Sequence, residues 1–253
     1  MDLQLKGLTA MVSGATRGIG RAIAETLAAE GANVSICARH DAEVQQTVAA
    51  LTAKGGKALG SAIDVADGAA LQRWVDATAE RFGGVDIVVA NVSALAIGQD
   101  EASWRKSFDV DMLGCVRFVD AAMPWLEKSK AASIVAISSV SGREVDFAAG
   151  PYGTFKAALV HYTQGLAFQH AAKGIRANAV SPGNTYFPGG VWEQIEKGNP
   201  DLFRKSLELN PTGRMGAPQD TANAVAFIAS PAASRISGTN LVVDGALTRG
   251  VQL

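Results

Sequence analysis

The sequence is poor in the residues that mark secreted, metal-binding and nucleic-acid-binding proteins. Its 253 residues include two cysteines, Cys37 and Cys115, and we expect free thiols because disulfides are rare in large cytosolic enzymes; a disulfide between the two is the alternative. The three histidines show no metal-ligand spacing, so no metal site is predicted. A formal net charge of -1 gives no electrostatic reason to expect a nucleic acid or a membrane surface as partner.

Long apolar runs and targeting signals are missing as well. No apolar run is long enough to cross a bilayer, and the first residues do not have the pattern of a signal peptide. Hydrophobic residues make up 48% of the chain and charged residues 19%, a balance that argues against disorder. A chain of this length buries roughly three quarters of the surface that its unfolded form exposes. We therefore expect a soluble cytoplasmic protein that folds without the help of disulfides or structural metal ions.

Short apolar stretches alternate with stretches of helical periodicity along most of the chain. Ile19, Ile23 and Leu27, for example, recur every four residues, and Gly31 follows as a stop. The strands are continuously apolar, which favours a parallel sheet covered by helices on both faces. The sequence therefore predicts one α/β domain over residues 1–253, with a doubly wound parallel sheet of about seven strands. Strands are expected at 8–13, 33–38, 58–63, 86–91, 133–138, 176–180 and 240–243, and further helices at about 41–54, 71–82, 102–127, 151–173 and 218–229.

One stretch, at about residues 184–215, lies outside this alternation. It carries the aromatic residues Tyr186, Phe187, Trp192 and Phe203. Because a long insertion in an α/β enzyme is often a lid over the site, we expect a substrate lid here. Its apolar side chains would then form a wall for an acyl chain or a ring. Packing against the body or a neighbouring subunit is the alternative.

The first predicted strand runs directly into a glycine-rich turn that opens a helix. Its pattern is G-x-x-x-G-x-G. Gly14 permits the tight turn, and the later glycines let a pyrophosphate approach the backbone, while the helix N-terminus supplies free N–H groups and partial positive charge. A glycine-rich turn without a ligand is the alternative. The predicted dinucleotide contacts in this turn are Gly14, Thr16, Arg17, Gly18, Ile19 and Gly20.

The end of the second strand indicates which dinucleotide is bound. NAD sites commonly place an acid there, which accepts a hydrogen bond from the ribose 2′-OH. This chain has Ala38 and then Arg39, and Arg17 lies inside the glycine turn. Two guanidinium groups would suit the 2′-phosphate of NADP(H), because arginine offers bidentate donors to phosphate. Two solvated arginines without a ligand are the alternative.

Three further residues form a set suited to carbonyl reduction. Tyr152 and Lys156 are spaced i, i+4 on a predicted helix, so their side chains share one face. Ser139 closes the fifth strand, whose carboxyl end faces the ligand crevice of a parallel sheet. A phenol is a poor acid–base group at neutral pH, and a nearby ammonium group favours its phenolate. Tyr152 can then protonate a carbonyl oxygen that Ser139 binds, as a hydride arrives from the nicotinamide.

Together with several short phrases, these motifs resemble the short-chain dehydrogenase/reductase family over nearly the whole chain. Within the family the sequence looks most like 3-oxoacyl thioester reductases. The phrases that carry the resemblance are Asp64-Val65, Asn91, Ile137-Ser138-Ser139, Ser181-Pro182-Gly183, Gly213-Arg214-Met215-Gly216-x-Pro218 and Val243-Asp244-Gly245.

The resemblance implies a Rossmann fold and several contacts that the motifs alone do not explain. It implies that Asp64 and Val65 contact the adenine and that Asn91 helps to hold the cofactor. Lys156 would also bond the nicotinamide ribose. Because the family usually assembles through its long helices, a homo-oligomer, either a tetramer or a dimer, is expected. The residues implied to lie beside the nicotinamide are Pro182, Gly183 and Thr185.

The sequence departs from the family in three places. The family's N-N-A-G after the fourth strand is replaced by Ala90–Ser93, which changes the surface that the cofactor is expected to contact. A family asparagine, which helps to anchor a water in a proton relay to the lysine, is replaced by Asp111. A carboxylate near Lys156 would hold the ammonium charged, so Asp111 joins the predicted catalytic set and a shifted pH profile is expected. Phe187 stands where a threonine is usual, which leaves the carboxamide contact open.

The predicted function is an NADPH-dependent carbonyl reductase that acts on a small molecule, either a 3-oxoacyl thioester or another ketone. Two alternatives stay open. The altered Ala90–Ser93 segment and Asp111 allow a dinucleotide-binding sensor or scaffold without catalysis, although the intact catalytic residues argue against it. An NAD-linked alcohol dehydrogenase is disfavoured by Arg39 and by the lack of an acid at Ala38.

Overall fold

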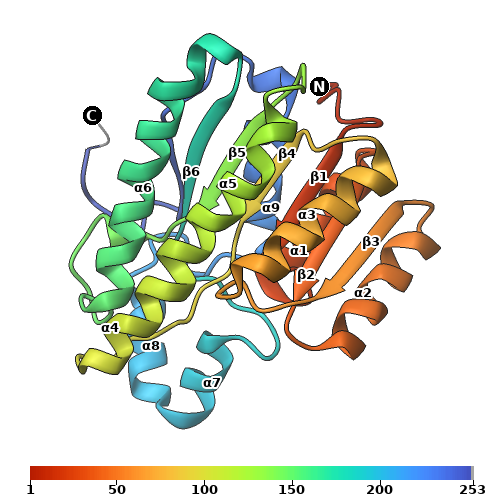
Figure 1. The fold of residues 1–253 in the computed structure, drawn as a ribbon. Coiled ribbons are helices and arrows are strands. Elements are labelled where there is room, and N and C mark those ends of the chain that lie inside the picture. The colour runs from red at the N-terminus through yellow and green to blue at the C-terminus, as the bar shows by residue number, and fades with distance from the viewer. Residues whose placement is uncertain (252–253) are drawn as a thin grey trace.

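Seven parallel strands form one sheet in the computed structural model, which describes residues 1–251 (Figure 1). The order across the sheet is β3-β2-β1-β4-β5-β6-β7, which confirms the predicted doubly wound parallel sheet. The order reverses between β1 and β4, and ligands of such sheets bind beside this switch point, at the carboxyl ends of the strands. The strands are β1 (Thr9–Ser13), β2 (Asn33–Ala38), β3 (Lys57–Ala62), β4 (Ile87–Ala90), β5 (Ser133–Ile137), β6 (Arg176–Pro182) and β7 (Asn240–Val243).

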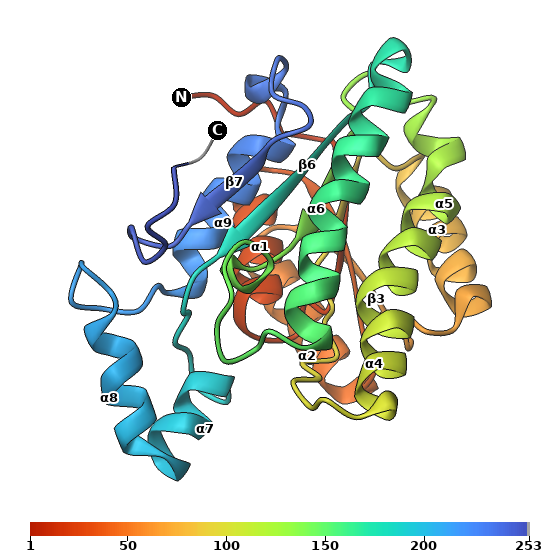
Figure 2. The same ribbon diagram turned by 90° about the vertical axis from the view of Figure 1, so that its left-hand side faces the viewer.

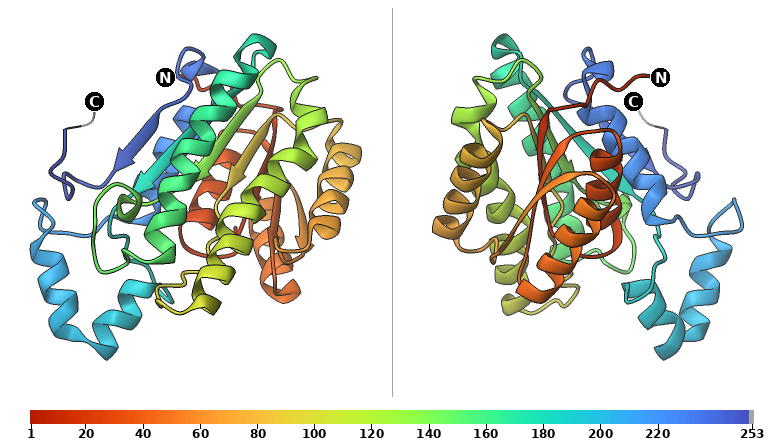
Figure 3. Two further views of the ribbon diagram at one scale, coloured as in Figure 1. Left: turned by 60° about the vertical axis from the view of Figure 1, so that its left-hand side comes forward. Right: turned by 90° about the vertical axis from the view of Figure 1, so that its right-hand side faces the viewer.

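Helices cover both faces of the sheet, as Figures 1 and 3 show. Because both faces are covered, every residue of β1, β4 and β5 is buried, which explains why these strands are largely apolar. None of the helices in residues 1–251 is long and apolar enough to cross a membrane. One layer contains α3 (Gly68–Phe82), α5 (Gly114–Leu126) and α6 (Pro151–His170), and the other contains α1 (Gly18–Ala29), α2 (Asp41–Ala53) and α9 (Pro218–Ala229).

The long helix expected at 102–127 is continuous but contains a π-helical turn. It begins with α4 (Glu101–Ser107), passes through η1 (Phe108–Leu113), whose hydrogen bonds are π-helical, and ends with α5. The extra residue per turn was not visible in the apolar periodicity. Such turns inside α-helices are frequent at functional sites. Here the turn carries Asp111, which is only 1% exposed.

The insertion at residues 184–215 is more regular than the sequence pattern indicated. It contains α7 (Val191–Gly198) and α8 (Pro200–Glu208), which stand away from the body below the end of β6 (Figure 2). A short parallel bridge joins Thr185 to Gly216, and the Tyr186 N–H donates to the Gly216 carbonyl at 2.8 Å. The insertion therefore leaves and re-enters the body at one point.

Cys37 and Cys115 are free, buried thiols, and we expect them to be unreactive in the native protein. Burial raises the pKa of both thiols from the ordinary value of 9.0 to about 12. Between these two pKa values the unfolded chain releases the thiol protons, whereas the folded protein keeps them. The free energy of unfolding therefore falls as the pH rises from about 9 towards 12. A thiol reagent at neutral pH should label nothing before denaturation and both cysteines afterwards. Rapid labelling of the native protein would contradict their placement.

Candidate active site

The glycine turn at the end of β1 is held in shape by Asn91, the first residue after β4. Asn91 Nδ2 donates to the Ser13 carbonyl at 3.1 Å and to the Gly14 carbonyl at 3.0 Å. The Asn91 backbone N–H donates to Ser13 Oγ at 3.0 Å. Gly14 has a φ of +65°, a conformation that favours glycine. Asn91 thus ties the two strand ends together across the switch point, and its side-chain amide is already engaged by the protein.

Helix α1 begins directly after this turn and offers a site for an anion. Its N-cap residue, Arg17, makes no side-chain capping bond, and its first turn contains no acid, so no side chain of the helix itself neutralises its first N–H groups. Gly18 has a φ of +54°, and a Cβ at Gly20 would collide with the Gly14 carbonyl. Ile19 packs on the core behind them. This donor set fits the pyrophosphate of a dinucleotide.

The two arginines predicted to bind a 2′-phosphate differ in their surroundings. Arg39 follows Ala38 at the end of β2, is exposed, and takes part in none of the ion pairs found within residues 1–251. Arg17 is also exposed, but its Nη1 lies 3.5 Å from the Gly189 carbonyl, so its guanidinium is directed to the insertion. Arg39 is therefore the arginine that stands free at the end of β2.

A further acid, Glu43, lies at the same end of the sheet and belongs to none of the motifs predicted from the sequence. Thr16 Oγ1 donates to a carboxylate oxygen of Glu43, in the first turn of α2, at 3.0 Å. Asp64 is exposed and accepts a hydrogen bond from the Ala66 N–H at 2.9 Å, whereas Val65 is buried. Thr16 of the phosphate turn thus already has a carboxylate partner.

Ser139 and Lys156 are brought together by β5 and α6. Ser139 follows β5 and accepts a hydrogen bond from the Ser141 N–H at 3.1 Å. Lys156 Nζ donates to the Ile137 carbonyl at 2.9 Å, and the Lys156 carbonyl accepts from Ser138 Oγ at 2.7 Å. Two bonds therefore fix the lysine against the strand end that carries Ser139.

Tyr152 lies in the first turn of α6, directly after the proline that begins this helix. The centre of its ring is 5.7 Å from Lys156 Nζ, so the predicted i, i+4 pair shares one face of the helix. Tyr152 is half-buried, whereas Lys156 is 2% exposed. The phenol is thus the member of the pair that a substrate can reach.

Two glycines allow the loop after Ser139 to lie directly on α6. A Cβ at Gly142 would lie 2.7 Å from the backbone nitrogen of Ala157. A Cβ at Gly153 would lie 2.7 Å from the Ser141 carbonyl oxygen. Contacts this short require a backbone shift, so the absence of side chains at these positions sets the distance between Ser139 and the tyrosine helix.

We expect Gly153→Ala to lower turnover by on the order of 10²-fold, because a displacement of about 1 Å between reacting groups has that effect. The matched control is Gly165→Ala on the same helix, where a Cβ would meet nothing within 4 Å. The control should keep its activity and gain up to about 1 kcal/mol of stability from alanine's helix propensity. Steady-state kinetics and chemical unfolding of both variants check this. Equal turnover in the two variants would refute the close approach.

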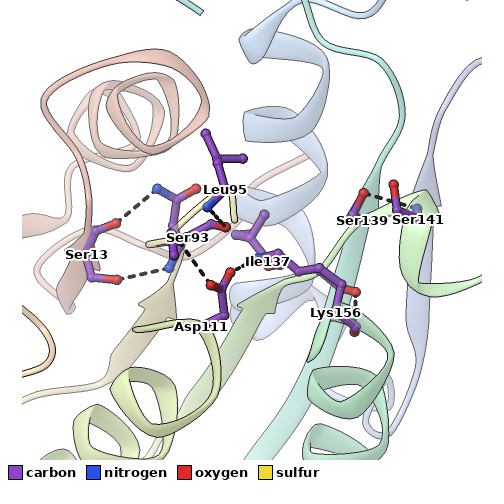
Figure 4. Close-up of polar contacts among 11 residues, drawn as sticks. Ser13, Ser93, Leu95, Asp111, Ile137, Ser139, Ser141 and Lys156 are labelled. Carbon is purple, nitrogen blue, oxygen red and sulfur yellow. Dashed lines mark hydrogen bonds and ion pairs between the residues drawn. The ribbon is translucent and has the colours of Figure 1, made fainter. Parts of the chain in front are cut away.

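Asp111 reaches Lys156 from the π-helical turn, as Figure 4 shows. Its Oδ1 lies 3.5 Å from Lys156 Nζ, and the two side chains are 0% and 3% exposed. This distance makes the contact an ion pair rather than a hydrogen bond, and Oδ1 has no hydrogen-bond partner in the described residues. Oδ2 accepts from the Ala94 N–H at 3.0 Å. The carboxylate expected near the lysine therefore links Lys156 to the loop after β4.

The segment after β6 brings the residues predicted to contact the nicotinamide to the same edge. The Gly183 N–H donates to the Val243 carbonyl at 3.0 Å, and a Cβ at Gly183 would lie 2.8 Å from Cβ of Asp244. Pro182 ends β6 and is buried. Thr185 Oγ1 donates to the Gly183 carbonyl at 3.0 Å, which closes the turn that begins the insertion.

Apolar side chains of two loops are exposed at the same end of the sheet. Leu95 and Ile97 follow β4, and Val145 and Phe147 follow β5. The Phe147 ring lies edge-on to Trp192 of α7, with centroids 5.9 Å apart. Exposed apolar residues on loops are surface that a ligand or a neighbouring subunit can cover. No cluster of three or more His, Cys, Asp or Glu side chains in residues 1–251 could hold a metal ion.

Comparison with known proteins identifies the family. A family model described as enoyl-(acyl carrier protein) reductase matches residues 14–248. Isoepoxydon dehydrogenase of Penicillium expansum is 41% identical over 254 residues, which cover 98% of this chain and 97% of the relative. The chain belongs to the short-chain dehydrogenase/reductase family. The resemblance seen in the sequence motifs is thereby confirmed.

Two solved structures of this family show different dinucleotides. A short-chain dehydrogenase from Burkholderia cenocepacia in complex with NADP has a TM-score of 0.88 and 33% identity, covering 96% of this chain and 99% of that one. A 7α-hydroxysteroid dehydrogenase complexed with NADH and 7-oxo glycochenodeoxycholic acid has a TM-score of 0.89 and 29% identity, covering 97% and 96%. As a short-chain dehydrogenase/reductase, the chain is an oxidoreductase of alcohol and ketone groups that uses a nicotinamide dinucleotide.

Proposed function

We propose that this short-chain dehydrogenase/reductase is an NADPH-dependent carbonyl reductase, reversible as an alcohol dehydrogenase. The observation that carries the choice of dinucleotide is Arg39, which is exposed and free of ion pairs in the described residues, after an alanine at the end of β2. A guanidinium in this place can bind a 2′-phosphate. The residues that would hold the dinucleotide are Gly14, Thr16, Arg17, Gly18, Ile19, Gly20, Arg39, Asp64, Val65, Asn91, Tyr152, Lys156, Pro182, Gly183 and Thr185.

In the proposed mechanism, Ser139 and Tyr152 act on the same substrate oxygen. Bound NADPH would supply the hydride. The Ser139 hydroxyl donates a hydrogen bond to the substrate carbonyl and orients it. The Tyr152 hydroxyl gives its proton to that oxygen, and the Lys156 ammonium stabilises the phenolate that remains. Asp111 holds Lys156 in place through the buried ion pair.

The proposed substrate is a ketone carried on an apolar ring or chain, with 3-oxoacyl thioesters among the candidates. The support is the exposed apolar side chains of the loops that follow β4 and β5, which are Leu95, Ile97, Val145 and Phe147. A relative named for an isoepoxydon substrate and a neighbour that holds a 7-oxo bile acid point to ring ketones. We propose that the insertion at residues 184–215 closes over this substrate as a lid.

An NAD-linked alcohol dehydrogenase is the second candidate, and Glu43 is the observation that favours it. Its carboxylate lies 3.0 Å from Thr16 Oγ1, on the phosphate turn, and would repel a 2′-phosphate placed near it. Two outcomes separate the candidates. If NADPH is the cofactor, Arg39→Ala lowers NADPH affinity by roughly tenfold or more, since a charge-assisted hydrogen bond is lost, and leaves NADH affinity unchanged. Tighter binding of NADH by the parent would favour the second candidate.

We also propose a homo-oligomer that assembles through the layer containing α5 and α6. The support is the exposed aromatic residues of this layer, with Phe168 of α6 85% exposed and Phe108 of η1 44% exposed. Exposed aromatic side chains on a helical layer are surface that a second subunit could bury. Light scattering coupled to size exclusion tests the proposal, and a monomer at micromolar concentration would contradict it.

A further inference from the structure

Phe187, at the start of the insertion, lies directly on the phosphate turn. A Cβ at Gly18 would be 2.5 Å from Cζ of the Phe187 ring, 2.7 Å from Cε2 and 2.9 Å from Cε1. Three ring atoms at these distances place the ring against the Gly18 backbone. The ring is therefore in contact with the residue that begins α1, whose N–H groups are the ones suited to a pyrophosphate.

The ring and a pyrophosphate compete for the same place. A pyrophosphate at a glycine turn must approach the backbone closely, because its binding depends on contact with the N–H groups of the helix N-terminus. The ring already fills the space above Gly18. A dinucleotide can thus engage this turn only if Phe187 moves away.

The contact also ties the insertion to the body. The Gly190 N–H donates to the Phe187 carbonyl at 3.0 Å, and the Gly189 N–H donates to Glu193 of α7 at 2.8 Å. Arg17 Nη1 reaches the Gly189 carbonyl at 3.5 Å. The short turn between Phe187 and α7 is therefore internally bonded, which links the backbone of Phe187 directly to α7.

Helix α7 in turn contacts the loop after Ser139, which we call the substrate loop. Trp192 of α7 is 7% exposed and packs edge-on against Phe147, in the loop after Ser139. The two ends of the insertion are paired at Thr185 and Gly216, so both of its connections to the body lie side by side. The insertion thus touches the phosphate turn through Phe187 and the substrate loop through Trp192.

We propose that Phe187 couples dinucleotide binding to the position of the insertion: the dinucleotide displaces the ring from Gly18, and α7 then moves over the substrate loop. This inference rests on the proposed function, because it takes a dinucleotide as the ligand of the turn. It makes Phe187 a positioning residue.

The test compares ligand affinities of the parent, Phe187→Ala and Phe203→Ala by calorimetry. Phe203 is the matched control, since its ring packs on Tyr186 within the insertion, with centroids 6.0 Å apart. Removing Phe187 removes the cost of displacing it, so NADPH or NADH should bind the variant about tenfold more tightly. Phe203→Ala loosens the insertion without freeing the turn and should not tighten binding. Adenosine 2′-monophosphate has no pyrophosphate and should bind all three proteins equally.

Hydrogen exchange gives a readout that is independent of activity. In the parent, the dinucleotide should change amide exchange in residues 187–198, whereas adenosine 2′-monophosphate should not. In Phe187→Ala, these amides should already exchange faster without ligand. If the parent binds a dinucleotide but Phe187→Ala binds it no more tightly, the coupling is wrong and the proposed function stands. If the parent binds neither NADPH nor NADH, the proposed function fails and the coupling fails with it.

Discussion

Tyr152→Phe is expected to lower carbonyl reduction by about 10²–10⁴-fold, the range that general acid catalysis supplies, while dinucleotide affinity stays close to that of the parent. The reason is chemical. The phenylalanine keeps the ring in the first turn of α6 but has no proton to give to the substrate oxygen. Steady-state kinetics with a responsive ketone and calorimetry with NADPH measure the two quantities on the same preparation.

Tyr162→Phe is the matched control, because it makes the same change on the same helix. Tyr162 is half-buried, and burial raises the pKa of its hydroxyl. This hydroxyl is thus a poorer proton donor than an ordinary tyrosine. Its loss should leave turnover equal to that of the parent within experimental error. If Tyr152→Phe turns over as fast as Tyr162→Phe, the proton comes from another group.

Asp111→Ala is expected to destabilise the protein by about 3–5 kcal/mol, because breaking a buried ion pair leaves the remaining charge uncompensated. Both side chains of the Asp111–Lys156 pair are almost completely buried, and Asp111 also accepts the Ala94 N–H. The alanine thus leaves the Lys156 ammonium without its counter-ion and the Ala94 N–H without its acceptor. Chemical unfolding measures the loss, and a change below about 1 kcal/mol would contradict a buried pair.

Asp111→Asn separates the charge from the hydrogen bond. The amide oxygen can still accept the Ala94 N–H, so most of the fold around the loop after β4 should persist. The substitution removes the negative charge beside Lys156, and Lys156 in turn acts on Tyr152. We therefore expect the rate-versus-pH curve of the asparagine variant to be displaced from that of the parent. Superimposable curves would show that Asp111 has a structural role alone.

The sheet could be predicted from the sequence because its inner strands are buried on both faces. Such strands are continuously apolar, and the glycines between them mark where helices stop, so all seven strands were expected within two residues of their bounds. The π-helical turn and the helices α7 and α8 were not predicted. The first differs from an α-helix by one hydrogen-bonding offset, and the other two are short and have one buried residue each.

The motif residues of the site could be predicted, but their partners could not. Ser139 and Lys156 meet because β5 precedes α6, which chain order already implies. The Thr16–Glu43 bond and the Phe187–Gly18 contact join residues far apart in the sequence, and neither follows a periodic pattern. Gly142 and Gly153 carried a readable signal, since glycine inside or beside a helix often marks a close approach.

The central claim is that this chain reduces ketones with NADPH. The most direct test adds NADPH or NADH to the purified protein, measures binding by nucleotide fluorescence, and then follows cofactor oxidation in the same samples with ring ketones and 3-oxoacyl thioesters. The account predicts tighter binding of NADPH and its oxidation by at least one apolar ketone. Tight binding without oxidation by any ketone would contradict it and favour a dinucleotide sensor.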